Sequence, residues 1–278
     1  MQSNKKLIYS NSFLAKAFVL LLAFFVFSCK KTDNESTNWK LVWSDEFEGE
    51  EGTALDASKW TYDIGGWGWG NNERQYYTDR TENASLDGDG NLQIVAREEN
   101  YESSNYTSAR ILTQNTFTQQ HGRFEARIKL PRGQGIWPAF WMLGANFPTV
   151  GWPTCGEIDI MEYLGNDVKT IHGSVHGPGY SAGNAVSSSY TVENARFDNK
   201  FYVFAVEWSS SAIKYYVDDN LYQTITPSQT NGTWVFNNEF FMILNVAVGG
   251  NWPGYPDEST RFPQTMYVDY VRVYVEND

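Results

Sequence analysis

The sequence predicts an all-β fold, an antiparallel β-sandwich of the jelly-roll type. Many short segments after residue 38 either alternate apolar and polar residues or form short apolar runs, as β-strands do. Turn signals such as Pro131-Arg132-Gly133 and Asn231-Gly232 separate these segments. Convincing helical periodicity is absent from the sequence after residue 38. Closely spaced strands of this kind favour two antiparallel sheets packed face to face.

The predicted strands follow one another along the chain after its first 38 residues. Further turn signals lie between them, for example at 87–91 and 218–220. In order, the predicted strands are residues 39–47, 92–96, 122–130, 139–143, 157–164, 170–175, 201–208, 212–217, 240–248 and 266–275. Since no Pro/Ser-rich linker and no internal repeat interrupts them in the sequence, we expect one domain over residues 39–278.

The first 29 residues are predicted to be a lipoprotein signal peptide. Lys5 and Lys6 precede an apolar run at 17–27, which has the length of a signal-peptide core and is too short to span a bilayer. The Ser-Cys pair that follows resembles the lipobox of bacterial lipoproteins, in which the cysteine, here Cys29, becomes the lipidated first residue. Residues 30–38 are then a flexible tether. We expect an exported chain, lipid-anchored at the outer membrane or cell surface; an ordinary secretory signal is the alternative.

The composition limits the kinds of molecule that the chain is expected to bind. The net charge of −12 argues against nucleic acid and against sulfated polyanions, but it is compatible with a neutral polysaccharide. If Cys29 carries lipid, Cys155 is the one cysteine left and no disulfide forms within a monomer. We expect Cys155 to be a small buried filler. A monomer, touching a membrane only through its lipid anchor, is the default for such a chain.

A short acidic segment, residues 156–163, carries the strongest chemical signal. Strict alternation places Glu157 and Asp159 on the solvent face of a strand but sends Glu162 inward, which buries a carboxylate without a partner. One extra residue, a β-bulge at 160–161, puts all three acids on the same face, and bulges are common beside active sites. Two carboxylates about 5–5.5 Å apart are what a retaining glycosidase needs. A solvated edge strand decorated with acids is the alternative.

Tryptophan is the second signal, because a flat indole covers the C–H face of a sugar ring and its N–H can bond a hydroxyl. Trp137 and Trp141 lie just before the acidic strand. Trp67, Trp69 and Trp252 lie in loops rich in glycine, which offers little to pack against, so we expect them to stack on sugar. The tryptophans in or beside strands are expected in the core: Trp43, Trp60, Trp208 and Trp234.

These motifs together resemble a known family. Gly-Glu-Ile-Asp-Ile-Met-Glu at 156–162, preceded by Trp-Pro-Ala-Phe-Trp-Met-Leu-Gly at 137–144, looks like glycoside hydrolase family 16, and in particular its laminarinase (endo-β-1,3-glucanase) branch. The six-residue form Glu-x-Asp-x-x-Glu matches laminarinases, whereas lichenases have a five-residue form. Further matches lie at 43–47, 70–78, 107–111, 172–177, 245–254 and 267–274. The resemblance implies a single catalytic domain over 39–278, with an open substrate cleft on the concave face of the jelly roll.

The resemblance also implies the catalytic roles. Glu157 is the expected nucleophile, Glu162 the general acid and later the base, and Asp159 an assisting residue. The two nearby anions should raise the pKa of Glu162, so that it holds a proton near neutral pH. The expected reaction is endo-acting cleavage of β-1,3-glucan by double displacement with retention. No cofactor is expected for catalysis.

Substrate contacts are expected around this centre. His176 follows the acidic strand closely, so we place it near the scissile bond, with His172 a weaker candidate. Family likeness suggests that several polar residues bind sugar hydroxyls; bracing of loops is their alternative role. The full predicted substrate-binding set is Trp67, Trp69, Asn71, Glu73, Arg110, Trp137, Trp141, His176, Asn251 and Trp252.

Asp269 predicts a structural metal site. On the last strand it shares a face with Val271 and Val273, so its carboxylate should point toward the apolar side and need hydrogen bonds or a cation. Many laminarinases hold a calcium ion away from the cleft. By resemblance, the ligands here are Glu48, the backbone oxygen of Gly90, and Asp269; such oxygen ligands suit a hard cation.

Two other functions stay open. The same fold and mechanism could act on mixed-linkage β-glucan or an algal galactan, a choice that loops around Trp67, Tyr180 and Trp252 would decide. A non-catalytic glucan-binding lectin would need a degraded catalytic triplet, and all three acids are present.

Overall fold

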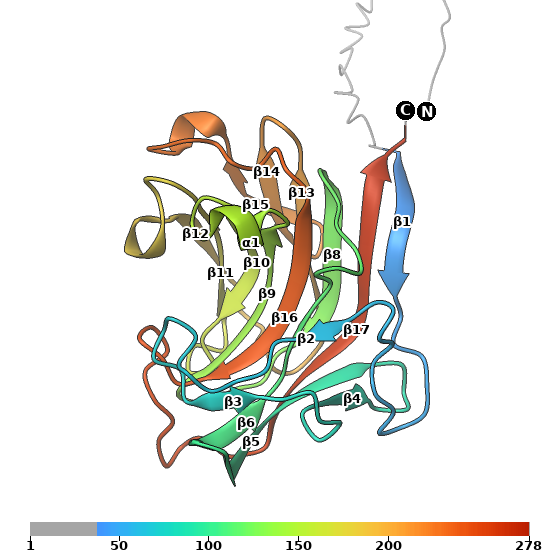
Figure 1. Ribbon diagram of the computed structural model, residues 1–278, viewed down its shortest axis with the longest axis vertical. Helices are drawn as coiled ribbons and strands as arrows, with labels where there is room; N and C mark the ends of the chain where they lie inside the picture. Colours follow the sequence, from blue (N-terminus) through green and yellow to red (C-terminus); the bar gives the residue numbers. More distant parts are fainter. Residues whose placement is uncertain (1–37, 278) are drawn as a thin grey trace, which may run out of the picture. The chain divides into compact units, whose positions relative to one another are not determined.

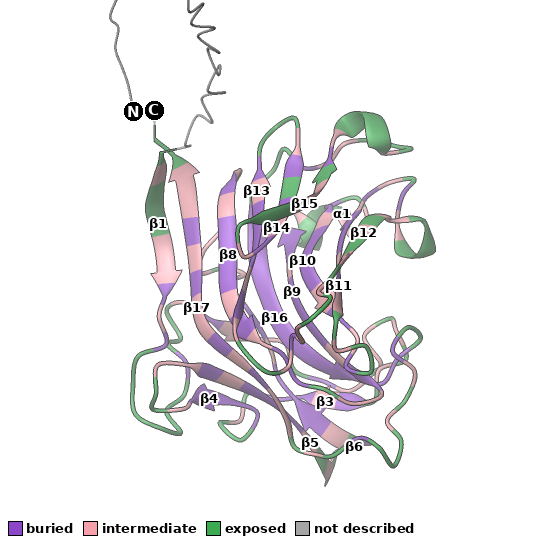
Figure 2. Cartoon of the chain, turned by 180° about the vertical axis from the view of Figure 1, so that it is seen from behind, coloured by how far each residue is buried: buried purple, intermediate pink, exposed green. Residues whose placement is uncertain are grey.

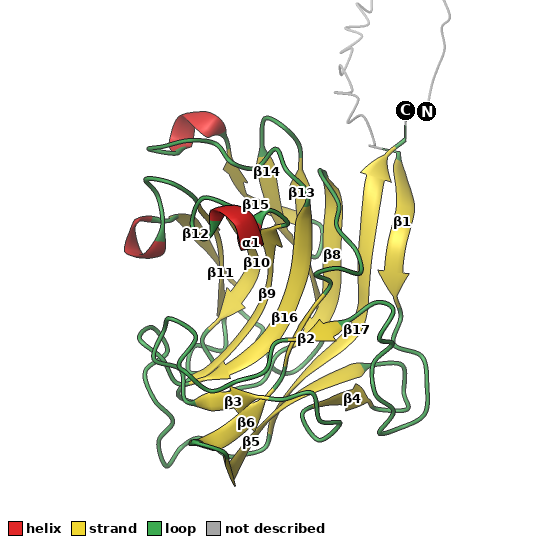
Figure 3. Ribbon diagram, in the orientation of Figure 1, coloured by secondary structure: helices red, strands yellow, loops and turns green. Residues whose placement is uncertain are grey.

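Two β-sheets packed face to face make up residues 38–277, the part of the chain that the computed structural model describes (Figure 1). Figure 3 shows that strands dominate, with helical turns only at α1 (Phe147–Val150), η1 (Ala182–Asn184) and η2 (Pro227–Gln229) among these residues. The predicted signal peptide with Cys29, and the predicted tether up to residue 37, lie outside the described residues. None of the helices in residues 38–277 is long and apolar enough to cross a membrane.

The larger sheet has ten strands in the order β15-β14-β13-β8-β17-β5-β6-β3, with β1 paired to β17 and β4 to β5. Its pairings are antiparallel except that of β3 with β6. Its strands are β1 (Trp39–Asp45), β3 (Gln75–Tyr77), β4 (Ala84–Leu86), β5 (Leu92–Tyr101), β6 (Ser104–Ser108), β8 (Gly122–Lys129), β13 (Tyr202–Trp208), β14 (Ile213–Val217), β15 (Asn220–Ile225) and β17 (Gln264–Glu276).

The smaller sheet has seven antiparallel strands in the order β12-β11-β10-β9-β16-β7-β2. Its strands are β2 (Thr61–Tyr62), β7 (Arg110–Leu112), β9 (Ile136–Gly144), β10 (Glu157–Tyr163), β11 (Thr170–His176), β12 (Val186–Thr191) and β16 (Phe240–Val248). The long strands of this sheet are visibly bowed in Figure 1. The two-sheet architecture confirms the predicted all-β jelly-roll sandwich.

Each of the predicted strands is present, with ends shifted by a few residues. The prediction omits seven strands: β2, with two residues, β3, β4 and β7, with three each, and β6, β12 and β15, with five or six. The shortest of them show no measurable periodicity in sequence and exist because longer neighbours offer them backbone partners.

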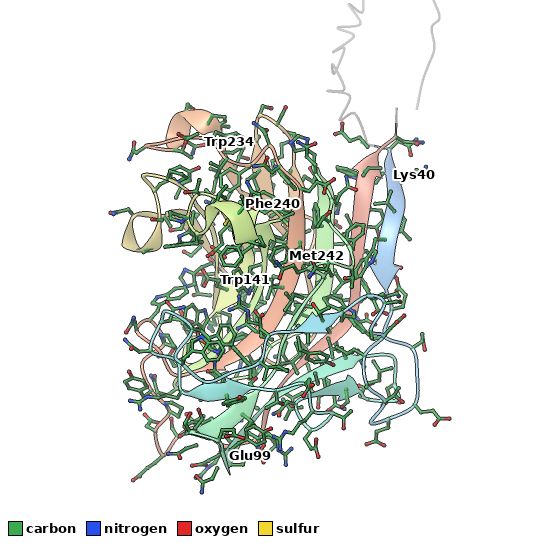
Figure 4. All side chains as sticks on the ribbon, viewed as in Figure 1. Lys40, Glu99, Trp141, Trp234, Phe240 and Met242 are labelled. Carbon is green, nitrogen blue, oxygen red and sulfur yellow. The ribbon has the colours of Figure 1, made fainter. Side chains whose placement is uncertain are left out.

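The core lies between the two sheets. All nine residues of β16 are buried, and the strand is purple along its length in Figure 2. Met242 of β16 pairs with Met142 of β9 inside this core, and Figure 4 labels Met242 and Phe240. The predicted core tryptophans all contact it: Trp60 and Trp208 are fully buried, whereas Trp43 and Trp234 pack against it half-buried.

A small second apolar cluster lies on the opposite face of the seven-stranded sheet. Strand alternation puts Leu143 on this outer face, because its neighbour Met142 faces the core. Cys155 is completely buried in the cluster, as the filler role predicts. The complete cluster is Leu112, Leu143, Cys155, Phe241 and Ile243.

The predicted orientation of Asp269 is wrong. β17 has an irregularity between Val268 and Tyr270 opposite β8, so the alternation that holds at Val271 does not extend back to Asp269. The Asp269 carboxylate instead forms an ion pair with Arg127 of β8, and its side chain stays about one-third exposed, at 34%. An arginine, rather than the apolar core, is its neighbour.

Candidate active site

The acidic strand β10 contains the predicted bulge. Opposite β9, Asp159 pairs with Trp141 and Met161 pairs with Phe140, so Ile160 is the extra residue. Ile160 and Met161 are both buried in the core as consecutive residues. The inserted residue therefore restores the outward direction at Glu162, and the bulge prediction is confirmed.

The bulge also keeps the two glutamates in register with both neighbouring strands. From Glu157 to Glu162 the chain advances five residues, while the partners on β9 advance four, from Leu143 to Ala139. On β11 the partners advance four as well, from His176 to His172. Five residues of β10 thus occupy the length of four, and both glutamates project from the outer face of the seven-stranded sheet.

Glu157 is held by a tryptophan that the sequence reasoning did not single out. The indole Nε1–H of Trp152 donates a hydrogen bond to Glu157 Oε2 at 2.9 Å. The other oxygen, Oε1, lies 3.7 Å from Nε2 of His176. Asp159, only 3% exposed, is closer to that imidazole, with its Oδ2 3.0 Å from Nε2.

The imidazole of His176 has a defined tautomer. Its Nδ1 accepts a hydrogen bond from the backbone N–H of Ala182 at 3.1 Å, so in the neutral ring the proton sits on Nε2. Nε2 lies 3.0 Å from Asp159 Oδ2 and 3.7 Å from Glu157 Oε1. In residues 38–277 these three side chains are also the one group whose ligand atoms lie close enough, within 4.8 Å, to share a metal ion. A metal ion on Nε2 would force the imidazole proton onto Nδ1, where it would meet the N–H of Ala182. The site therefore suits acid–base chemistry better than metal binding.

Glu162 has its own set of neighbours. The indole Nε1–H of Trp137 donates to Glu162 Oε1 at 3.2 Å. His172 is its register partner on β11. The ring of Trp252 lies edge-on to the rings of His172 and Trp137, with centroid distances of 5.0 Å and 5.6 Å. Trp137, His172 and Trp252 therefore form one aromatic group beside the predicted proton donor.

Burial raises the pKa of all three carboxyl groups. The pKa of Glu157 rises to about 8 because of burial and the charge of Asp159, although His176 and the Trp152 indole lower it. The pKa of Glu162 rises well above its usual value because of burial and then the charges of Asp159 and Glu157. The pKa of Asp159 is also raised by burial. Near neutral pH the three groups cannot all be ionised, and Glu162 is the one that both other charges disfavour as an anion.

A chain of hydrogen bonds ties Trp141 to Glu73. Trp141, labelled in Figure 4, donates through Nε1 to Asn245 Oδ1 at 2.8 Å. Asn245 Nδ2 donates to the hydroxyl of Tyr77 at 3.1 Å, and Tyr77 donates to Glu73 Oε2 at 3.2 Å. Gln75 also donates to that oxygen, at 2.6 Å. Asn245, Tyr77 and Gln75 were not predicted; all three are buried, and only the fold brings them together.

Arg110 lies between two of the predicted tryptophans. Its guanidinium carbon is 4.9 Å from the ring of Trp69 and 4.7 Å from that of Trp141, a cation–π arrangement on both sides. Its Nε is also 2.9 Å from Asp63 Oδ2. Trp67 lies beside Trp69, with its ring tilted by 34° and the centroids 5.1 Å apart, and it is 73% exposed, so this aromatic group ends in an open indole.

The remaining predicted residues brace the loops that carry these rings. Asn71 donates to Glu73 Oε1 at 3.3 Å, and its carbonyl accepts the backbone N–H of Asn251 at 2.8 Å. The side chain of Asn251 accepts from Asn72 at 2.8 Å. Asn71 and Glu73 therefore bond each other, and Asn251 is held by Asn71 and Asn72; for Asn71 and Glu73 these contacts correspond to the bracing alternative. Tyr180, expected in a specificity loop, is instead buried at 1% exposure and donates to the Thr233 carbonyl.

The predicted calcium ligands are only partly together. Glu48 Oε1 lies 3.7 Å from where a Cβ on Gly90 would sit, so these two residues are neighbours. Asp269 is engaged by Arg127. Two of the three predicted ligand residues are therefore neighbours, while the third already has a cationic partner.

Comparison with known proteins identifies the family of the chain. The family model for Glycosyl hydrolases family 16 matches residues 71–272. The chain is 44% identical over 253 residues to the Beta-glucanase of Rhodothermus marinus, covering 87% of each chain.

Two solved structures resemble the described fold closely. The catalytic domain of an endo-1,3-beta-glucanase (laminarinase) from Thermotoga petrophila shares 47% sequence identity at a TM-score of 0.83, covering 87% of this chain and 100% of that one. The endo-beta-1,3-glucanase from Pyrococcus furiosus shares 46% identity at a TM-score of 0.82, covering 86% of this chain and 95% of that one. With the bulged acidic strand and the two-sheet sandwich already in place, these matches lead to one conclusion: the chain belongs to glycosyl hydrolases family 16.

Proposed function

We propose that this chain is an endo-acting, retaining glycoside hydrolase that cleaves β-1,3-glucan of the laminarin type. The observation that carries the proposal is the bulge in β10, which projects Glu157, Asp159 and Glu162 from one face of the sheet. Each glutamate also accepts a hydrogen bond from an indole N–H, so both carboxyl groups have fixed positions.

The reaction follows from the different environments of the two glutamates. Ionised Glu157 attacks the anomeric carbon while Glu162 donates its proton to the glycosidic oxygen, and the bond from that oxygen to the anomeric carbon breaks. A glycosyl ester on Glu157 remains. Glu162, now a carboxylate, removes a proton from water, which attacks the same carbon and releases Glu157. Two inversions give net retention. Burial and the two neighbouring anions support Glu162 as the proton donor.

The proposed substrate is a neutral β-1,3-glucan. A net charge of −12 disfavours anionic polymers, and the exposed indoles of Trp67 and Trp252 offer faces for sugar rings. The relatives named as Beta-glucanase and endo-1,3-beta-glucanase support the same class. Sugar contacts at Asn71, Glu73, Arg110, His176 and Asn251 are part of the proposal.

Activity on three polymers tests the proposal. The purified domain is incubated with laminarin, lichenan and agarose, and reducing ends are followed beside a Glu157→Ser variant. We expect release from laminarin by the wild type and a loss of at least about hundredfold in the variant. Release only from lichenan or agarose would move the substrate to mixed-linkage glucan or galactan. Binding of laminarin with no release above the variant would indicate a lectin.

We also propose a structural calcium ion near Glu48 and Gly90. Their proximity supports it, although the ion would share Asp269 with Arg127. Thermal unfolding with calcium or with EDTA tests this proposal. We expect a higher Tm in calcium, and no such difference in Glu48→Ala. An unchanged wild-type Tm would reject the site.

Export with a lipid anchor on Cys29 is a proposal from sequence alone. The apolar run and the Ser-Cys pair support it. A Cys29→Ala variant should move from the membrane fraction to the soluble fraction of cells. An unchanged membrane fraction would contradict lipidation at this cysteine.

A further inference from the structure

The loop before β10 places an indole directly on the predicted nucleophile. Trp152 lies in the segment Gly151–Gly156 between α1 and β10, and its Nε1–H donates to Glu157 Oε2 at 2.9 Å. We propose that Trp152 is a positioning residue that fixes which oxygen of Glu157 attacks the sugar. This inference rests on the proposed function, because it assigns a part in the same reaction.

The loop itself holds the indole in place. The N–H of Cys155 bonds the carbonyl of Gly151 at 2.9 Å, and the N–H of Gly156 bonds the carbonyl of Pro153 at 3.1 Å, so the turn is closed by its own backbone. The fully buried Cys155 anchors it to the outer apolar cluster. Gly156 has a φ of +82°, where a side chain would be strained and would meet Phe240 at 3.0 Å.

The two oxygens of Glu157 therefore have different tasks. Oε2 accepts the indole hydrogen bond, whereas Oε1 is 3.7 Å from the nearest cationic candidate, His176 Nε2. His176 Nε2 is closer to Asp159, at 3.0 Å, than to Glu157. Within residues 38–277, Oε1 carries no indole hydrogen bond, and it is the oxygen that we assign to the bond with the anomeric carbon. The reaction rate depends on the distance and the angle at which the attacking oxygen meets the anomeric carbon. Because the indole fixes Oε2, it also holds the rest of the carboxylate in place and aids the chemical step.

The indole also favours the ionised form of the nucleophile. A hydrogen bond from a neutral donor stabilises a carboxylate more than a carboxylic acid, and the Trp152 bond lowers the pKa of Glu157 against burial and the charge of Asp159. The other groups that face Glu157 are Glu162 on the same strand, whose pKa the charge of Glu157 raises, and His176 from β11, which lowers the pKa of Glu157. The thiol of Cys155 is also near; burial raises its pKa to about 11, so it stays neutral. Loss of the indole N–H should therefore move the acid limb of activity to higher pH.

The test compares two tryptophan-to-phenylalanine changes. Trp152→Phe keeps an aromatic ring and removes the donor. Trp234→Phe is the matched control, because the Nε1 of Trp234 has no hydrogen-bond partner within residues 38–277 and so donates to no carboxylate there. For Trp152→Phe we expect kcat on laminarin to fall about tenfold or more, with the acid limb of kcat/KM rising by about one pH unit. The control should change neither quantity more than about twofold.

A spectroscopic measurement keeps the proposal independent of the substrate. The indole Nε1–H resonance of Trp152, assigned by its loss in Trp152→Phe, should shift with pH in the wild type and stop titrating in Glu157→Gln. If kcat and the acid limb of Trp152→Phe match the wild type, whatever happens to KM, Trp152 is only a sugar contact and the proposal is wrong. If the resonance does not titrate, it is also wrong. If the resonance titrates but laminarin is not cleaved, the positioning stands and the proposed function fails.

Discussion

Deletions in the bulge should affect activity through the face of the strand on which they leave Glu162. Deleting one residue and deleting two leave this glutamate on opposite faces, so the effect should follow that face and not simply the number of residues removed. Deletion of Ile160 leaves Glu157, Ile158, Asp159, Met161 and Glu162 in strict alternation, with all acids still outward. The partner strands already advance only four residues between the two glutamates, so the register on both sides is kept. Deleting Ile160 and Met161 together reverses the parity and turns Glu162 inward.

The stability change follows from burial. Ile160 is 1% exposed, and removing a buried isoleucine side chain costs about 2–5 kcal/mol. In a domain of this size each kcal/mol lowers Tm by about 2–4 °C, so the single deletion should lower Tm by roughly 4–20 °C. Ile160→Ala is the control, because it leaves a similar cavity and keeps the bulge.

The activity change follows from the position of Glu162. Ile160→Ala should keep kcat within about tenfold of the wild type, since its catalytic groups stay in register. The single deletion should lose up to about a hundredfold, because small displacements of catalytic groups carry penalties of that order. The double deletion should fall to the level of Glu162→Gln, which lacks the general acid.

The assay is reducing-end release from laminarin at a temperature where circular dichroism shows each variant folded. The decisive comparison is the single deletion against Glu162→Gln, because it does not require the double deletion to fold. If the folded single deletion is no more active than Glu162→Gln, the argument that parity alone directs this glutamate outward is refuted.

Two further changes probe the same strand. Asp159→Asn removes an anion that raises the pKa of Glu162, so the basic limb of kcat/KM, where the proton donor ionises, should move to lower pH; an unmoved or raised limb would contradict the electrostatic account. Gly173 lies on β11 opposite the bulge, and Gly173→Ala places a Cβ against the hydroxyl of Tyr222 and 2.7 Å from the buried ring of Tyr215. Tm should therefore fall by about 2–12 °C for a cost of about 1–3 kcal/mol. Gly183→Ala, with open space around its Cβ, is the control and should leave Tm nearly unchanged.

The bulge in β10 was predictable because strict alternation would have carried a high energetic cost at Glu162. Three acids in one apolar strand cannot all face solvent without an extra residue, and burying Glu162 without a partner is costly. The structure has that residue at Ile160. The same reasoning failed for Asp269, where extrapolation from Val271 put the carboxylate inside and a cation was invoked to compensate. A second bulge and the ion pair with Arg127 solve that problem instead.

Contacts between loops and strands could not be predicted from the sequence. Trp152 lies five residues before Glu157, and nothing in that spacing shows that a backbone-closed turn folds the indole back onto the carboxylate. Likewise, Tyr77 and Asn245 are far apart in the chain, and only the packing of β3 near β16 joins them. The pattern of apolar residues predicts which face a side chain takes, but partners across a fold depend on how the turns are built.

The anomeric configuration of the first product tests the central claim most directly. Laminarin is added to the enzyme in an NMR tube, and the reducing-end anomeric protons are recorded in the first minutes, before mutarotation mixes the anomers. Attack by Glu157 followed by attack by water predicts that the β-anomer is released first and the α-anomer grows in later. An initial α-anomer would mean that water attacks directly, and the roles given to Glu157 and Glu162 would be wrong.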